Sequence, residues 1–210
     1  MMAAEKTQLR RGELRYDEPM ARHNSWRAGG HARCFYKPAD VDDLCDFLGQ
    51  LDPQEPLLWL GLGSNLLVRD GGFPGTVIST LGVLTDREWL DATHLRAGAG
   101  VTCAKVARTC AQQGLTGLEF LAGIPGTMGG ALAMNAGAFG GETWSRVAAV
   151  ETVDRAGRLH LRQPDEYRVG YRTVRGIADD WIVAARLTLE HGDAVAAQQR
   201  IRQLLAQRGE

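Results

Sequence analysis

The sequence predicts an α+β fold in two lobes. The elements of the first half run strand, helix, strand and then further strands, which is not the regular alternation of a doubly wound sheet. A glycine-rich stretch at residues 117–142 separates a predicted helix from a second region made mostly of strands. The length of 210 residues allows one large domain or two small lobes that share an interface.

The first half contains short apolar runs and one amphipathic segment. Residues 1–20 are polar and are expected to be loosely ordered. A helix is predicted after Asp40, which is placed to cap it, because apolar residues then recur at helical spacing. These residues are Val41, Leu44, Leu48 and Leu51. Strands are expected at 34–38, 57–60, 76–80 and 94–100.

The second half begins with a predicted helix over residues 102–114, with a capping Thr102 and a glycine stop. Alternating apolar residues on both sides of 154–157 predict a hairpin, and 181–190 reads as a strand. A last helix is expected to run to the chain end. The predicted organisation is a polar N-terminal segment (1–20), a first lobe (21–85), a second lobe (86–190) and a C-terminal helix (191–210).

Composition excludes several classes of function. With 44% apolar and 23% charged residues and a net charge of −1, the chain is predicted to be a folded soluble protein that binds neither nucleic acid nor acidic membranes. The N-terminus lacks an apolar signal region, and no run approaches a membrane span, which predicts a cytoplasmic protein. The four cysteines and five histidines show no metal-ligand spacing, so no metal is expected.

Two glycine-rich segments have a backbone that suits anion binding. In LGLGSNLLVRD a strand ends in a sharp turn, and in LAGIPGTMGGALAMNAGAFGG glycines recur without any basic residue. Runs of unobstructed N–H groups bind anions, above all a pyrophosphate. The chain has no Gly-Lys-Ser/Thr of a P-loop. A nicotinamide-binding Rossmann domain is disfavoured because 117–142 reads as a long loop or a broken helix.

The two segments, in this order and spacing, resemble the UDP-N-acetylenolpyruvoylglucosamine reductases (MurB) of bacterial cell-wall synthesis. The matching stretches are NSWRAGG, WLGLGSNLLVRDGGFPGTVI, GAGVTCAKVARTCAQQGLTGLEFLAGIPGTMGGALAMNAGAFGGE and YRVGYR. The resemblance implies a two-lobed FAD-binding domain of the vanillyl-alcohol-oxidase/PCMH type, with non-covalent FAD between the lobes. NADPH is the implied co-substrate.

The resemblance also assigns cofactor contacts by position. The pyrophosphate region would be held by Gly61, Leu62, Gly63, Ser64, Asn65 and Leu66. The other side of the flavin would be lined by Gly123, Ile124, Pro125, Gly126, Thr127, Gly129 and Gly130. The isoalloxazine and ribityl chain would lie beside Asn135, Gly137 and Ala138, and the adenine near the main chain of Ile182.

In this family NADPH reduces FAD, and the flavin then delivers hydride to the enolpyruvyl ether of a UDP-sugar. Arg172 matches the catalytic arginine, and Tyr171 precedes it as a substrate-binding residue. A guanidinium suits the negative charge that develops beside the substrate carboxylate. Taken without the resemblance, YRVGYR reads as a solvated strand with alternating arginines.

The resemblance calls for a proton-donating serine and a late glutamate in a third domain. No serine follows Arg172, and the only later glutamates are Glu190 and Glu210. The first hypothesis is therefore a truncated FAD-binding portion of the reductase that is unable to turn over alone. The second is a catalytically inactive flavin-binding module of the same fold. An oxidase is less favoured, because no His or Cys stands in the glycine-rich segment to tether FAD.

Loss of a third domain would expose apolar surface, including part of the cleft and the apolar side of the last helix. A monomer with weak self-association is the expectation.

Overall fold

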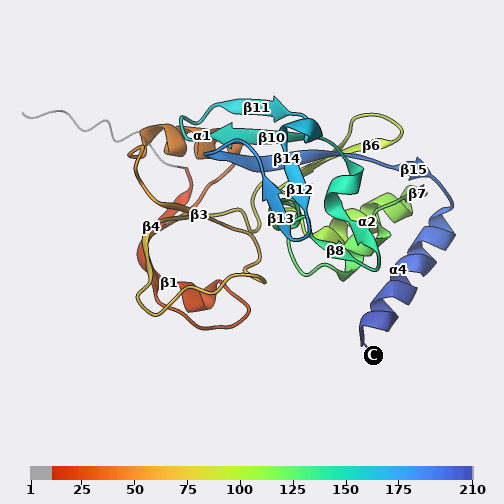
Figure 1. The fold of residues 1–210 in the computed structure, drawn as a ribbon, viewed down its shortest axis with the longest axis horizontal. Helices are drawn as coiled ribbons and strands as arrows, with labels where there is room; N and C mark the ends of the chain where they lie inside the picture. Colours follow the sequence, from red (N-terminus) through yellow and green to blue (C-terminus); the bar gives the residue numbers. More distant parts are fainter. Residues whose placement is uncertain (1–10, 210) are drawn as a thin grey trace, which may run out of the picture.

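The computed structural model describes residues 11–209, which form two lobes lying side by side (Figure 1). The first lobe is a four-stranded sheet in the order β1-β2-β4-β3. Its strands are β1 (Glu13–Pro19), β2 (His31–Lys37), β3 (Leu57–Leu60) and β4 (Phe73–Ser79). β1 pairs antiparallel with β2, whereas β2 and β3 both run parallel to β4. The short η1 (Met20–Arg22) follows β1, and α1 (Val41–Gln50) connects β2 to β3.

The second lobe is built on a five-stranded antiparallel sheet in the order β11-β10-β14-β6-β5. The strands are β5 (Arg87–Trp89), β6 (His94–Gly98), β10 (Val147–Asp154), β11 (Leu159–Arg162) and β14 (Asp180–Thr188). The helices are α2 (Cys103–Gln112), α3 (Met128–Ala133) and α4 (Ala194–Gly209). Together with one face of the sheet they enclose the largest apolar core.

Short elements connect these parts. Three two-stranded ladders pair β7 (Leu115–Thr116) with β15 (Glu190–His191), β8 (Gly137–Ala138) with β9 (Gly141–Glu142), and β12 (Arg168–Gly170) with β13 (Thr173–Arg175). Single 3-10 turns lie at η2 (Glu119–Gly123), η3 (Thr143–Arg146) and η4 (Pro164–Glu166). The glycine-rich stretch is therefore a broken helix, η2 followed by α3, and then a small ladder.

Helix α1 joins the two lobes. Its buried Leu44, Phe47 and Leu48 share one core cluster with Val153 of β10 and Val183 of β14. Asp40 accepts a hydrogen bond from the Asp43 N–H at 2.9 Å, which confirms the predicted N-cap. The lobes therefore share an apolar interface rather than a flexible linker.

Three sequence-based expectations need correction. Seven of the twenty residues predicted to be loosely ordered, 13–19, form strand β1; residues 1–10 lie outside the described part. Thr102 stands at the N-cap of α2, but its side chain makes no capping hydrogen bond. The apolar side of α4 is open only in part: Ala197, Ile201 and Leu204 are buried against the second lobe, whereas Val195 and Leu205 are exposed.

Neither a membrane-crossing helix nor a metal cluster is found where the structure is described. None of the helices within residues 11–209 combines the length and the apolar character that spanning a bilayer requires. The same residues contain no group of three or more His, Cys, Asp or Glu side chains that could hold a metal ion.

Asp43 is a buried carboxylate on which the first lobe depends. It accepts hydrogen bonds from Tyr36 Oη at 2.5 Å, from the Ala39 N–H at 2.8 Å and from the Arg11 N–H at 3.1 Å. Burial raises the pKa of this carboxyl, but the hydrogen bonds from Tyr36, Ala39 and Arg11 outweigh burial and the net pKa is lowered. A carboxyl with a lowered folded-state pKa stabilises the fold above its unfolded pKa, and this contribution is lost as the pH falls through the folded pKa.

We therefore expect Asp43→Asn to lower the free energy of unfolding at neutral pH by about 2–3 kcal/mol. The variant should also lose less stability than the wild type as the pH falls from 5 to 2, because the titrating group is gone. Urea unfolding across this range measures both effects. Asp46→Asn, on an exposed position of the same helix, is the matched control. Equal acid sensitivity of Asp43→Asn and the wild type would contradict the assignment.

Candidate functional site

The two glycine-rich segments meet between the lobes. Gly61, directly after β3, lies so close to Thr127 that a Cβ at position 61 would stand 2.4 Å from Thr127 Oγ1. Ser64 Oγ donates a short hydrogen bond to the carbonyl of Pro125. The turn of the first lobe (61–65, the GLGSN turn) and the connector of the second lobe (123–130, the IPG connector) therefore form one site.

Backbone geometry explains the glycine at the centre of the GLGSN turn. Gly63 has φ +73°, and a Cβ there would stand 1.9 Å from the carbonyl oxygen of His23. Its own carbonyl accepts from the Ser25 N–H at 3.1 Å, which fixes the turn against the NSWRAGG stretch. Among residues 11–209, no backbone hydrogen bond outside helices and strands has a donor between 61 and 66. These N–H groups are therefore available to an anion.

The IPG connector is held from behind by the loop that follows β6. The Met128 and Gly129 N–H groups donate to the carbonyls of Val101 and Ala99 at 2.8 and 2.9 Å. A Cβ on Gly129 would stand 3.0 Å from the Ala99 Cβ, so glycine allows this close approach. Thr127 Oγ1 is buried and has no hydrogen-bond partner within the described chain.

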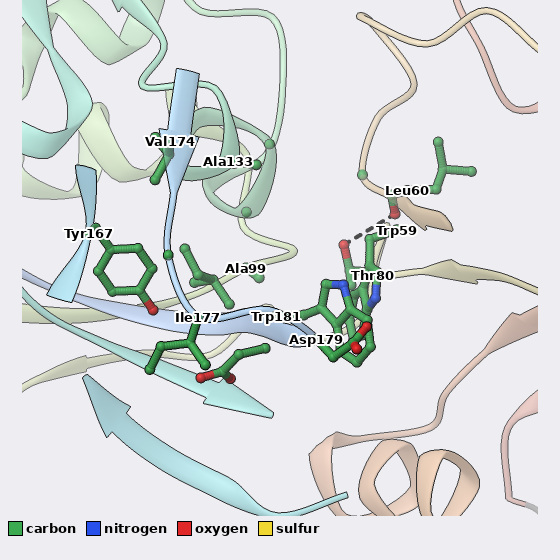
Figure 2. Close-up of a pocket in the computed structure, with 16 residues that line it drawn as sticks. Trp59, Leu60, Thr80, Ala99, Ala133, Tyr167, Val174, Ile177, Asp179 and Trp181 are labelled. Carbon is green, nitrogen blue, oxygen red and sulfur yellow. Dashed lines mark hydrogen bonds between the residues drawn. The ribbon is translucent and has the colours of Figure 1, made fainter. Parts of the chain in front are cut away.

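A cavity of about 350 Å³ lies between the lobes beside this junction (Figure 2). Its walls come from β3, the GLGSN turn, α3, β14 and the segment 167–180. The lining residues are Trp59, Leu60, Gly61, Thr80, Ala99, Gly129, Gly130, Ala133, Tyr167, Val174, Gly176, Ile177, Asp179, Asp180, Trp181 and Ile182. Its volume falls in the range of small-molecule and cofactor sites.

Four of the predicted cofactor-binding residues line the cavity itself: Gly61, Gly129, Gly130 and Ile182. The remainder of the GLGSN turn and of the IPG connector is next to it in the chain. Gly137 and Ala138 lie in the β8–β9 ladder. The roles of these residues toward a cofactor stay predictions.

Polar atoms without partners gather around the cavity. Trp59 Nε1, Tyr167 Oη and Asp180 Oδ1 are buried in lining residues, and none has a hydrogen-bond partner within residues 11–209. Together with Thr127 Oγ1 they are four unsatisfied groups at one junction. Buried polar groups are rarely left unpaired in proteins, so this arrangement fits a bound polar molecule such as FAD.

Sequence reasoning missed Trp59, Tyr167 and Asp180 as site residues. Tyr167 stands within a quoted motif, YRVGYR, but nothing in the sequence marks it or the other two as polar groups left without partners. Burial raises the pKa of Tyr167 to about 12, and the nearby negative charge of Asp180 adds to this effect. The phenol therefore stays protonated and remains a donor at neutral pH.

Arg172 is brought to the edge of the same junction. It lies in the turn between β12 and β13 with φ +51°, and its Nη2 is 3.5 Å from Asn65 Oδ1 of the GLGSN turn. Tyr171 beside it is 85% exposed. Neither residue lines the cavity. YRVGYR is thus a hairpin that presents Tyr171 and Arg172 to solvent, and not one continuous strand.

Asn135 has partners of its own. Its amide donates to Glu142 Oε2 at 3.0 Å and to the Gly170 carbonyl at 3.3 Å, and its carbonyl accepts from the Trp144 N–H at 3.2 Å. Asn135 therefore ties the end of α3 to the β12–β13 hairpin that carries Arg172. Its predicted contact with the isoalloxazine stays a prediction.

Cys103 and Cys110 are structural residues of α2. Both are buried in the core of the second lobe, and burial raises the pKa of each thiol to about 12. Such thiols are not nucleophiles at neutral pH, so both cysteines serve as small apolar side chains of the core.

The fold and the cleft define a two-lobed FAD-binding domain. Residues 32–161 match the family described as FAD binding domain. The chain resembles 6-hydroxy-D-nicotine oxidase from Arthrobacter nicotinovorans in fold alone, with a TM-score of 0.60, 17% identity, and coverage of 86% of this chain and 42% of that one. The chain belongs to the UDP-N-acetylenolpyruvoylglucosamine reductase family, as the following relatives show.

The relative from Alkalilimnicola ehrlichii is 60% identical over 208 residues, which cover 99% of this chain and 69% of the relative. The relative from Methylococcus capsulatus is 58% identical over 94% of this chain and 65% of its own length. The crystal structure of the reductase MurB from Thermus caldophilus aligns with a TM-score of 0.78 and 29% identity, over 95% of this chain and 70% of that one. The chain thus spans about two thirds of the length of the curated relatives it matches.

Proposed function

We propose that this chain holds FAD for the NADPH-dependent reduction of UDP-N-acetylglucosamine enolpyruvate to UDP-N-acetylmuramate, a step of peptidoglycan precursor synthesis. The observation that carries the proposal is the meeting of the GLGSN turn and the IPG connector at a cavity bordered by unpartnered polar atoms. The names of the relatives supply the reaction. FAD, when bound, supplies the hydride transfer between NADPH and the enolpyruvyl carbon.

The residues of this chain would bind FAD and orient it. The N–H groups of 61–66 would hold the anionic diphosphate, because no basic side chain stands within the turn and backbone dipoles bind anions without one. Glycine at 130 keeps this part of the wall free of a side chain, so a flat ring can approach the backbone there. Thr127 Oγ1, which lacks a protein partner, would bond to the cofactor near the diphosphate.

Arg172 would stabilise the substrate. Its guanidinium stands at the mouth of the junction beside Asn65, where it can pair with the substrate carboxylate and with the negative charge that builds up next to it. No serine follows Arg172 in this chain. We therefore propose that the proton for the substrate carbon comes from a group outside residues 1–210.

Anaerobic visible spectroscopy of the FAD-loaded chain tests this proposal. After desalting, the flavin bands should remain with the protein and should bleach on addition of NADPH. The bands should then return on addition of the enolpyruvyl UDP-sugar only if a proton donor is supplied. Flavin that is retained but not bleached would instead favour the inactive flavin-binding module. Loss of all flavin on desalting would contradict both.

We also infer a cytoplasmic protein that is a monomer or weakly self-associating. Several large apolar side chains lie on the surface: Trp26 is 70% exposed, Leu67 63% and Val195 68%. Such side chains support weak self-association. Light scattering across a concentration series measures it.

A further inference from the structure

Helix α4 packs against the part of the second lobe that leads into the IPG connector (Figure 1). Its buried Ile201 and Leu204 lie in one core cluster with Phe120 and Leu121 of η2. η2 ends at Gly123, where the IPG connector begins. One side of α4 is thus packed against the segment that runs directly into the predicted flavin wall.

Arg208, in the last turn of α4, contacts the connector through its side chain. Its Nη1 donates a hydrogen bond to the carbonyl oxygen of Gly123 at 2.9 Å, across 85 residues of sequence. Basic side chains in the last turn of a helix commonly bond to carbonyls of their own helix. Arg208 instead donates to another segment, and its charge makes this hydrogen bond stronger than one between neutral groups.

Three carbonyl groups of the IPG connector accept hydrogen bonds from three different elements. The three bonds run from Arg208 of α4 to Gly123, from Ser64 of the GLGSN turn to Pro125, and from the Cys103 N–H of α2 to Gly126. Arg208 is the only charged donor of the three. The position of the connector therefore depends on α4 as well as on the GLGSN turn and α2.

The backbone at Gly123 is closely packed. A Cβ at this position would stand 2.4 Å from Cε2 of Phe139, which lies in the turn between β8 and β9. Gly123 thus contacts an aromatic ring from one segment and a guanidinium from another. A shift of its carbonyl would disturb both contacts, because closely packed groups move only together with their neighbours.

We propose that Arg208 is a positioning residue for FAD: it ties the last turn of α4 to the first residue of the IPG connector and so holds the wall against which the flavin binds. This inference rests on the proposed binding of FAD. Its consequence is a coupling between the end of α4 and the cofactor. Because such coupling is reciprocal, bound FAD should in turn hold the end of α4 against the connector.

Titration of the cofactor-free chain with FAD, followed by flavin fluorescence, tests this inference. Arg208→Met keeps an apolar stem and removes the donor, and it should raise the FAD dissociation constant about 10-fold. Arg208→Lys keeps a charged donor and should stay within about 3-fold of the wild type, because only one hydrogen bond is made here. Arg202→Met, on an exposed position of the same helix, is the matched control and should change the affinity less than about 2-fold.

Hydrogen exchange followed by mass spectrometry gives a second readout, which a purely structural role of Arg208 would not change. In the wild type, FAD should slow amide exchange in the last turns of α4, residues 203–208, by up to about the same 10-fold factor. In Arg208→Met, FAD should leave exchange in these turns unchanged. Thermal unfolding without the cofactor checks that each variant folds.

The outcomes separate this inference from the proposed function. A folded Arg208→Met that binds FAD as tightly as Arg202→Met would overturn the inference, as would equal protection of α4 by FAD in the wild type and in Arg208→Met. If Arg208→Met does not fold, the wild type and Arg208→Lys decide: protection of α4 by FAD supports the inference and its absence overturns it. A wild type that binds no FAD would overturn both this inference and the proposed function. Flavin that binds but is not bleached by NADPH would refute the reductase activity alone and would leave the role of Arg208 standing.

Discussion

Gly63→Ala is expected to abolish retention of FAD. The residue has φ +73°, and an added Cβ would stand 1.9 Å from the His23 carbonyl oxygen, which belongs to the backbone and cannot rotate away. A left-handed conformation alone costs about 1–2 kcal/mol for alanine. The collision must displace the turn from residues 23–25 as well, so we expect a total loss of at least about 3 kcal/mol in folding or FAD binding. Desalting after FAD loading and urea unfolding measure the two.

Two glycines provide matched controls. Gly71 has nothing within 4 Å of a built Cβ and no positive φ, so Gly71→Ala should retain FAD as the wild type does. Gly140 has φ +82° but also open space, so Gly140→Ala isolates the conformational cost at about 1–2 kcal/mol. If Gly63→Ala retained FAD as well as Gly71→Ala does, the turn would not be the binding element proposed here.

Most elements could be predicted because their signals are local. The cap at Asp40 and the helical spacing after it lie within one segment, and α1 begins and ends near the expected residues. The hairpin around residues 154–157 carries its own alternation on both sides, and β10 and β11 pair as expected. Such patterns need no information from distant parts of the chain.

Strand β1 could not be predicted in the same way. Its sequence, ELRYDEP, is mostly polar, and it forms a strand because it pairs along β2 at the sheet edge. That pairing depends on tertiary context, which outweighs local β-propensity. The same reason explains α4, whose apolar side was expected to be open and is instead covered in part by the second lobe.

The candidate site also has features that local sequence predicts and features that depend on the tertiary structure. Glycine density showed that bare backbone would face a ligand, because only glycine allows the φ of Gly63 or the approach of Gly129 to Ala99. It could not show that Asp180 and Tyr167 keep unpartnered polar atoms, since partners are known only when distant segments are placed together. The additional role of Asn135, which holds the Arg172 hairpin, depends on Gly170, 35 residues away.

Arg172→Ala should leave FAD retention and bleaching by NADPH unchanged but slow the substrate-dependent return of the flavin bands about 100-fold or more. The guanidinium contacts Asn65 only at 3.5 Å and does not line the cavity, so we expect FAD to lose no contact. What is lost is the paired donor for the substrate carboxylate. Arg172→Lys should recover little, because a lysine lacks the planar fork. Stopped-flow measurement under anaerobic conditions, with an added proton donor, gives the rate.

Backbone strain at position 172 offers a way to separate chemistry from folding. Because φ is +51°, Arg172→Gly relieves the left-handed conformation and should raise the free energy of unfolding by about 1 kcal/mol, while losing as much substrate rate as Arg172→Ala. Arg175→Ala, on an exposed position of the same hairpin, should change neither quantity. A variant that becomes more stable and yet loses the substrate step identifies Arg172 as a residue held under strain for its chemistry. If Arg172→Gly instead kept the wild-type rate of the substrate-dependent return of the flavin bands, this step would depend only on the backbone shape of the hairpin. The role proposed for the guanidinium would then be wrong.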